Sequence, residues 1–147
     1  MDPVRNTLLN GYKMSLEKAR KLASTGMLPQ ASYHLYVALQ LRAAALLRLV
    51  NPASNHTCSV SAIMKLIEKA LQSQGLVELA ERFKKIEQEY RDAVKWAEKV
   101  HTLVMYKPVD VSMEMFDKVL SLINELEQLE TDLLATAKSR ASEANGS

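Results

Sequence analysis

Between Gly75 and Pro108 the chain contains neither glycine nor proline, and this segment constrains the fold more than any other. Its apolar residues recur three or four positions apart, which is the heptad pattern of a helix that packs along its whole length. The pattern predicts one long helix over residues 76–104, whose buried face is formed by Leu76, Leu79, Phe83, Ile86, Tyr90, Ala93, Ala97, Val100 and Val104.

Four other segments have helical periodicity, over residues 4–25, 29–50, 60–74 and 112–140. Asp2 is placed to cap the first of them, and Thr57 or Ser59 to cap the third. Gly26 and Gly75 stand where a helix commonly ends in a left-handed residue. The sequence therefore predicts an all-α fold, an antiparallel bundle of about five helices. It forms one domain over residues 1–140, followed by a frayed tail over residues 141–147.

The two longest predicted helices are too long for a compact domain of 147 residues. A helix of roughly 30 residues extends about 45 Å. Either the helix over residues 76–104 kinks, or it projects together with the last helix and builds a seam between two copies. We expect a homodimer.

The net charge is only +2, but the charged residues are unevenly distributed. No acidic residue occurs between Lys18 and Lys65, whereas the segment from Asp110 onwards carries eight acidic residues and three basic ones. One interpretation is that a basic layer of helices packs beside an acidic layer. The other is that a basic face binds ligands that carry phosphate.

Several classes of protein do not fit the sequence. Cys58 is the single cysteine, so no disulfide forms within the chain, and no apolar run is long enough to span a membrane. We expect a cytoplasmic protein that contacts no membrane. Glu98 and His101 have the spacing of ligands in di-iron bundles, but a second such pair is missing. No cofactor and no metal are predicted.

Arg42 and Arg48 are the most informative candidate site residues, because they occur in an otherwise apolar helix. A guanidinium in such a position must reach solvent, bind an anion or pair with a carboxylate. His56 follows in a polar loop, where it either caps the next helix or contacts phosphate beside Arg48. The acidic candidates for pairing with the two arginines are Glu125, Glu127 and Asp132.

From residue 15 to about residue 134, the order of these features resembles the HEPN (higher eukaryote and prokaryote nucleotide-binding) superfamily. The resemblance rests on Ala-Arg-Lys-Leu-Ala-Ser-Thr-Gly at residues 19–26 and Ala-Ser-Tyr-His-Leu-Tyr-Val-Ala at residues 31–38. It extends to Arg-Ala-Ala-Ala-Leu-Leu at residues 42–47 and to His56 ahead of an apolar helix. The resemblance implies a small helical bundle, often dimeric, whose relatives bind nucleotides or RNA or accompany nucleotidyltransferases.

Catalytic members of this superfamily are ribonucleases with an arginine, four to six intervening residues and a histidine. Here nine residues separate Arg91 from His101, and seven separate Arg48 from His56. Where many relatives have Arg-Tyr-Pro, this chain has Tyr-Lys-Pro at residues 106–108. The sequence therefore departs from the ribonuclease pattern.

The first functional hypothesis is a non-catalytic dimer that binds RNA or a nucleotide through a basic surface. Arg42, Arg48 and His56 would contact phosphate, and Lys18 and Lys21 would add general attraction. One alternative is a protein-interaction module, such as a partner of a nucleotidyltransferase, that uses apolar residues Trp96, Val94 and Leu103. Another alternative is a divergent HEPN ribonuclease.

Overall fold

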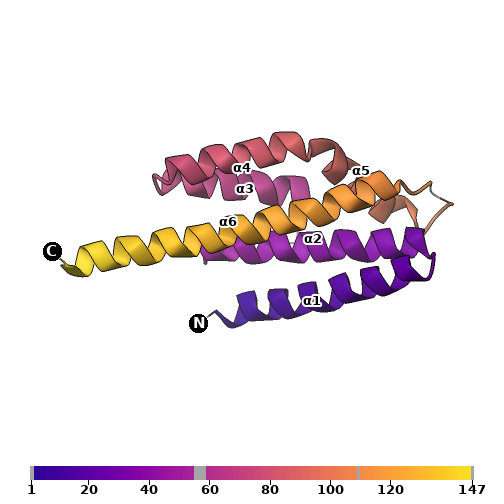
Figure 1. Cartoon of the computed structure of the whole chain (residues 1–147), viewed down its shortest axis with the longest axis horizontal. Coiled ribbons are helices and arrows are strands. Elements are labelled where there is room, and N and C mark those ends of the chain that lie inside the picture. Colours follow the sequence, from indigo (N-terminus) through magenta and orange to yellow (C-terminus); the bar gives the residue numbers. More distant parts are fainter. Residues whose placement is uncertain (1, 55–58, 109, 147) are drawn as a thin grey trace.

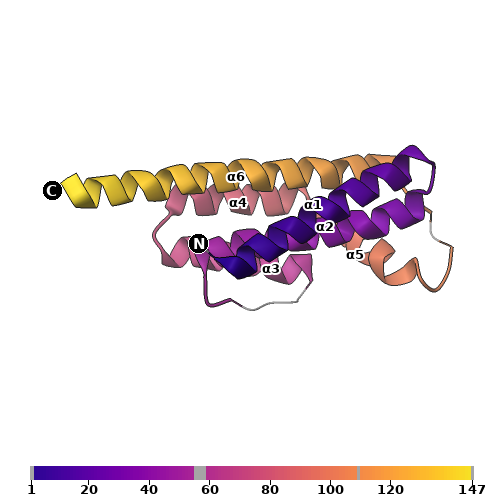
Figure 2. The ribbon, with the colours of Figure 1, turned by 90° about the horizontal axis from the view of Figure 1, so that it is seen from below.

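A computed structural model describes residues 2–54, 59–108 and 110–146, and in these ranges the chain forms a bundle of six helices (Figure 1). α2, α3 and α6 run in one direction, whereas α1 and α4 run in the other (Figures 1 and 2). The prediction of an all-α bundle is confirmed. None of the described helices is both long and apolar enough to cross a membrane. The helices are α1 (Pro3–Ser24), α2 (Leu28–Val50), α3 (Val60–Ser73), α4 (Val77–Glu89), α5 (Arg91–Leu103) and α6 (Met113–Gly146).

The central element is α2, which packs against α1, α3, α5 and α6. Many of its buried residues are alanines, including Ala31, Ala38, Ala43 and Ala45. Small side chains allow neighbouring helices to approach closely from several sides. The alanine-rich sequence of residues 31–45 therefore explains how one helix can have four neighbours.

The ends of the helices follow local signals in the sequence. The Asp2 carboxylate accepts a hydrogen bond from the backbone N–H of Val4 at 3.0 Å, and the Ser59 hydroxyl accepts one from Ala62 at 3.3 Å. Gly26 and Gly75 have φ angles of 80° and 71°, in the left-handed region that favours glycine. These caps confirm the prediction, and the other candidate cap, Thr57, lies outside the described residues.

The helix predicted over residues 76–104 is broken at Tyr90, which has φ −102° and ψ 9° and separates α4 from α5. The prediction of one continuous helix is therefore wrong, and the kink that the sequence left open is present. The break lets α4 pack against α3 and α6 while α5 packs against α2 and α6. The apolar stripe on both halves consequently faces the core.

The last helix, α6, extends beyond the rest of the bundle. It has 34 residues, which corresponds to about 51 Å. Its C-terminal part continues past the ends of the other helices in two perpendicular views (Figures 1 and 2). The helix continues to Gly146, beyond the end predicted near residue 140.

Candidate functional site

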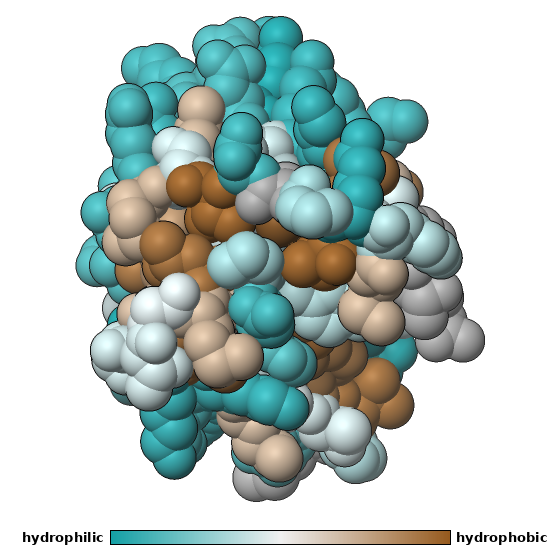
Figure 3. All heavy atoms as spheres, turned by 90° about the vertical axis from the view of Figure 1, so that its right-hand side faces the viewer, coloured by the Kyte–Doolittle hydropathy of each residue, from teal (hydrophilic) through white to brown (hydrophobic). Residues whose placement is uncertain are grey.

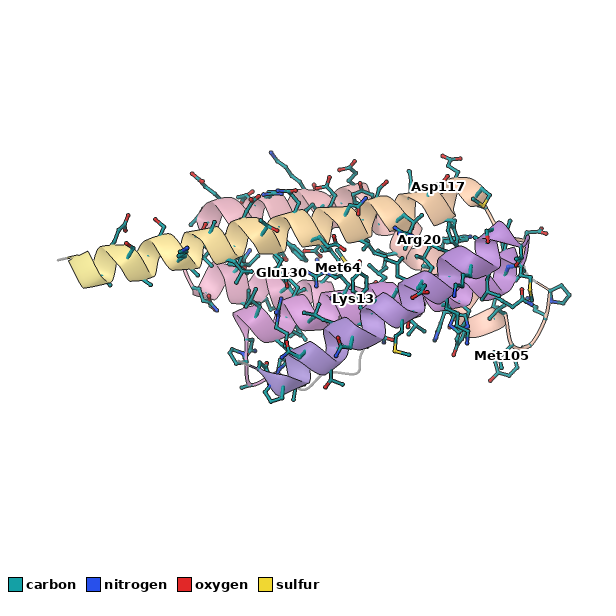
Figure 4. All side chains as sticks on the ribbon, turned by 60° about the horizontal axis from the view of Figure 1, so that its bottom comes forward. Lys13, Arg20, Met64, Met105, Asp117 and Glu130 are labelled. Carbon is teal, nitrogen blue, oxygen red and sulfur yellow. The ribbon has the colours of Figure 1, made fainter. Side chains whose placement is uncertain are left out.

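Arg42 lies inside the bundle, where its side chain is 3% exposed. Its guanidinium forms an ion pair with Glu130 of α6, which also binds Arg5 of α1. Figure 4 shows Glu130 between α6 and α1. The guanidinium lies 5.6 Å from the centre of the Tyr12 ring. The expectation that Arg42 contacts phosphate is therefore corrected, because a surface ligand does not reach it. The alternative that Arg42 pairs with a carboxylate is the one observed. The partner is Glu130 of α6, which is not one of the three acidic residues predicted from the sequence.

Arg48 is also engaged by a carboxylate. It donates to both carboxylate oxygens of Asp2, at 2.9 and 3.0 Å, and to the backbone oxygen of Ser54 at 3.0 Å. These hydrogen bonds lower the pKa of Asp2. Arg48 thus joins the start of α1 to the end of α2, and its role as a phosphate contact is not supported. His56 lies outside the described residues.

Lys18 and Lys21 are exposed on α1, away from the pairs made by Arg42 and Arg48. Lys21 forms an ion pair with Glu17, one turn earlier, at 3.3 Å. Lys18 lies close enough to His34 to contribute to the lowered pKa of that histidine, although burial is the larger cause. Of the predicted phosphate contacts that the structure describes, only Lys18 and Lys21 are exposed, so the four do not form one basic surface.

Three other cations do converge, at a groove of about 300 Å³ between α3 and α5. The break at Tyr90 places the end of α4 and the first turns of α5 along one wall of this α3–α5 groove. Met64 and Val94 are buried and supply apolar surface, while Lys65, Arg91 and Lys95 are exposed. The groove is lined by Ser61, Met64 and Lys65 of α3, Glu87 of α4, and Arg91, Val94 and Lys95 of α5.

Glu87 is the one carboxylate in the lining of the groove. One of its oxygens lies 3.5 Å from the ammonium nitrogen of Lys65, and the other is buried without a hydrogen-bond partner among the described residues. Burial raises the pKa of Glu87, and the nearby Glu68 raises it further. Three cations against one carboxylate give the groove a formal excess of two positive charges, which favours an anionic ligand.

A cluster of aromatic rings lies near the other end of α5. The His101 ring stacks on Tyr33 with 4.6 Å between ring centres, and it contacts Tyr36 at 4.5 Å. His34 meets Tyr33 edge-on at 5.3 Å. Burial lowers the pKa of His101, so its ring is neutral at physiological pH. We call Tyr33, His34, Tyr36 and His101 the aromatic cluster.

The first turn of α3 connects the aromatic cluster with the groove. The Tyr36 hydroxyl accepts a hydrogen bond from the backbone N–H of Val60 at 3.3 Å. The next residue, Ser61, lines the groove and donates to the carboxylate of Glu98 on α5. Glu98 is therefore occupied by Ser61, and no group of three potential metal ligands is found among the described residues.

Two signals in the sequence point to these features but were not part of the predicted site. Arg91, Lys95 and Lys99 are four residues apart and therefore share one face of a helix. Tyr33 and Tyr36, three residues apart, share a face of another helix. The pairing of those two faces depends on contacts between residues far apart in the sequence, which periodicity does not reveal.

The comparison with protein families gives one result. The HEPN domain family matches residues 12–133, which is most of the chain. Neither the search of curated proteins nor the search of solved structures found a match.

Proposed function

Because this chain belongs to the HEPN domain family, we propose that it is a non-catalytic cytoplasmic protein that binds RNA or a nucleotide through the α3–α5 groove. The convergence of Lys65, Arg91 and Lys95 on one groove is the observation that carries this proposal. Among the described residues, neither Arg91 nor Lys95 forms an ion pair with a carboxylate, unlike Arg42 and Arg48. Their charges are therefore available to phosphate.

The size of the groove supports the same class of ligand. A volume of about 300 Å³ is at the lower end of the range for small-molecule sites. Met64 and Val94 add apolar surface beside the cations, which suits a ligand that combines phosphate with a flat apolar group. Lys18 and Lys21 stay in the proposal as sources of long-range attraction on a neighbouring helix, and Arg42 and Arg48 do not.

The test is fluorescence anisotropy of a labelled single-stranded RNA at about 50 mM and 200 mM salt. If three cations neutralise three phosphates of a single strand, the fourfold rise in salt should weaken binding roughly 20-fold. The double variant Arg91→Glu, Lys95→Glu should bind far more weakly and depend less on salt. The matched control, Lys13→Glu with Lys138→Glu, makes the same change in net charge at exposed residues outside the groove.

Two results would contradict this proposal. One is that wild-type protein binds no RNA at the lower salt and, in a separate titration, no nucleoside triphosphate. The other is that the control variant weakens binding as much as the groove variant, which would mean that only net charge matters. Circular dichroism of each variant establishes that it is folded.

A protein partner is the second candidate, and an apolar end of the bundle favours it. The residues named for this role from the sequence are poorly placed, because Val94 is buried and Trp96 and Leu103 are partly buried. Large exposed apolar residues are found instead where the α1–α2 turn and the α5–α6 connection lie (Figure 3). They are Met27, Met105, Tyr106 and Met113, of which Met105 and Tyr106 are 76% and 84% exposed.

A nucleotidyltransferase, which accompanies some HEPN proteins, is the partner proposed for this apolar end. Co-purification of this chain with the nucleotidyltransferase encoded beside it, where one exists, would test the proposal. Replacing Met105 and Tyr106 with serine should then abolish the complex. Replacing the exposed Met14 of α1 with serine is the control and should leave the complex intact.

We also propose a homodimer, and the projecting end of α6 supports it. Leu134 is exposed on α6 and lines an apolar groove of about 310 Å³ together with Leu49, Leu76 and Leu133. In a dimer with twofold symmetry, α6 of each copy lies against this groove of the other.

A further inference from the structure

The α3–α5 groove and the aromatic cluster each include residues of α5. Arg91 and Lys95 line the groove, Glu98 bonds to Ser61 at its margin, and His101 follows three residues later. His101 is ten positions after Arg91, which corresponds to about 15 Å along the helix. A ligand longer than a mononucleotide can therefore contact both features.

The aromatic cluster provides surface for a flat ring. Tyr33, His34 and His101 are partly exposed, whereas Tyr36 is buried and holds the cluster against the start of α3. Every nucleobase has a flat π face, so tyrosine and histidine rings bind bases without regard to sequence. Lys18 lies beside His34, so a further cation is available for a phosphate next to the stacked base.

Packing alone does not account for this arrangement well. Tyr33 and His101 are each partly exposed, so the stacked contact between them lies at the surface and not in the core. An aromatic pair that follows directly from a basic groove matches the combination that single-strand-binding proteins use. In those proteins cations follow the backbone and aromatic side chains take the bases.

We infer that the ligand of the α3–α5 groove is an unpaired RNA strand, with its phosphates on Lys65, Arg91 and Lys95 and a base stacked on Tyr33, against the ring face opposite His101. This inference rests on the proposed function and narrows its ligand from RNA or a nucleotide to an unpaired RNA strand. The 15 Å span corresponds to roughly four nucleotides at about 3.4 Å each, or fewer if the strand is extended. Bases in a duplex are already paired and stacked, so duplex RNA binds more weakly.

The experiment compares oligoadenylate, which has bases, with inorganic polyphosphate, which has none. The variant Tyr33→Leu should weaken binding of oligoadenylate about 5- to 150-fold, the range measured for loss of one base–aromatic stack. Its binding of polyphosphate should be unchanged. Tyr33→Phe keeps the aromatic ring and should bind as the wild type does. Tyr106→Leu removes an exposed tyrosine at the end of the bundle and serves as the matched control.

A second measurement detects stacking directly. Fluorescence of 2-aminopurine within the oligoadenylate should be quenched by wild-type protein and by Tyr33→Phe, but not by Tyr33→Leu. The inference is overturned if folded Tyr33→Leu binds oligoadenylate like the wild type, or if it loses oligoadenylate and polyphosphate equally. The proposed function fails separately if Arg91→Glu with Lys95→Glu leaves binding of both polymers unchanged.

Discussion

Arg42, Arg5 and Glu130 form a network in which one carboxylate serves two guanidinium groups from different helices. The three side chains are 3%, 18% and 13% exposed, so water screens them little. Tyr12 donates a hydrogen bond to Glu127 one turn away on α6, and burial and that carboxylate together raise the pKa of Tyr12. Polar side chains therefore link α1 and α2 to α6.

Replacing Arg42 with methionine should lower the free energy of unfolding by about 3 kcal/mol, because removal of one partner from a buried ion pair leaves the other poorly compensated. Urea denaturation gives this value. Lys21→Met removes the exposed pair with Glu17 and should change stability by less than about 0.5 kcal/mol. If the two substitutions lowered the free energy of unfolding equally, burial of the Arg42 ion pair would not be the source of its contribution to stability.

The stability of the protein should depend on pH through His101. Its pKa in the folded state lies below the ordinary value of 6.5, so the unfolded chain takes up a proton at higher pH than the folded chain does. The contribution of neutral His101 is fully present above about pH 6.5 and declines as the pH falls through that value.

His101→Phe keeps an aromatic ring and removes the titration, so it isolates this effect. Denaturation at about pH 7.5 and 5.5 should show a smaller loss of stability in the variant than in the wild type. Two other groups also make stability depend on pH. The raised pKa of Glu87 favours the folded state at low pH, and the lowered pKa of His34 disfavours it there. Both groups are present in the wild type and in the variant, so their effects cancel in the comparison. Identical pH dependence in the two proteins would contradict the assignment.

The turn between α1 and α2 contains Gly26, and the turn between α3 and α4 contains Gly75. Each turn depends on the positive φ angle of its glycine. A side chain added at either glycine would meet no heavy atom within 4 Å, so the cost of substitution comes from the positive φ angle alone. Gly75→Ala should therefore lower the free energy of unfolding by about 1 kcal/mol. Gly75→Asn should recover part of that loss, since asparagine tolerates the left-handed region. Thermal denaturation of the two variants tests the order.

The sequence predicts the elements well where the signal is local. Asp2, Ser59, Gly26 and Gly75 mark helix ends because capping involves residues only two or three positions apart. The break at Tyr90 carries no such mark, since neither glycine nor proline is near it. It arises because two halves of one apolar stripe pack on different neighbours. The roles of Arg42 and Arg48 escape sequence reasoning for a related reason: their carboxylate partners lie 88 and 46 residues away.

For the molecule as a whole, the projecting part of α6 sets the oligomeric state that we expect. Replacing Leu134 with glutamate places a charge on the surface proposed to join two copies. Light scattering after size exclusion should change from a dimer to a monomer, with little change in melting temperature because Leu134 is 46% exposed. Lys118→Glu, an exposed position near the start of the same helix and outside this groove, is the control. A wild-type protein that is already monomeric would refute the dimer.

The backbones of α1 and α6 are not in contact, since no Cα atom of one helix lies within 8 Å of a Cα atom of the other. Side chains alone connect the two helices. Arg5 and Tyr12 bridge the gap to Glu130 and Glu127. This arrangement has a consequence for the chain as it leaves the ribosome. At about 5–20 residues per second, the 88 positions between Arg42 and Glu130 take roughly 4 to 18 seconds to synthesise. During that interval Arg42 has been synthesised, but the carboxylate of Glu130 that pairs with it has not.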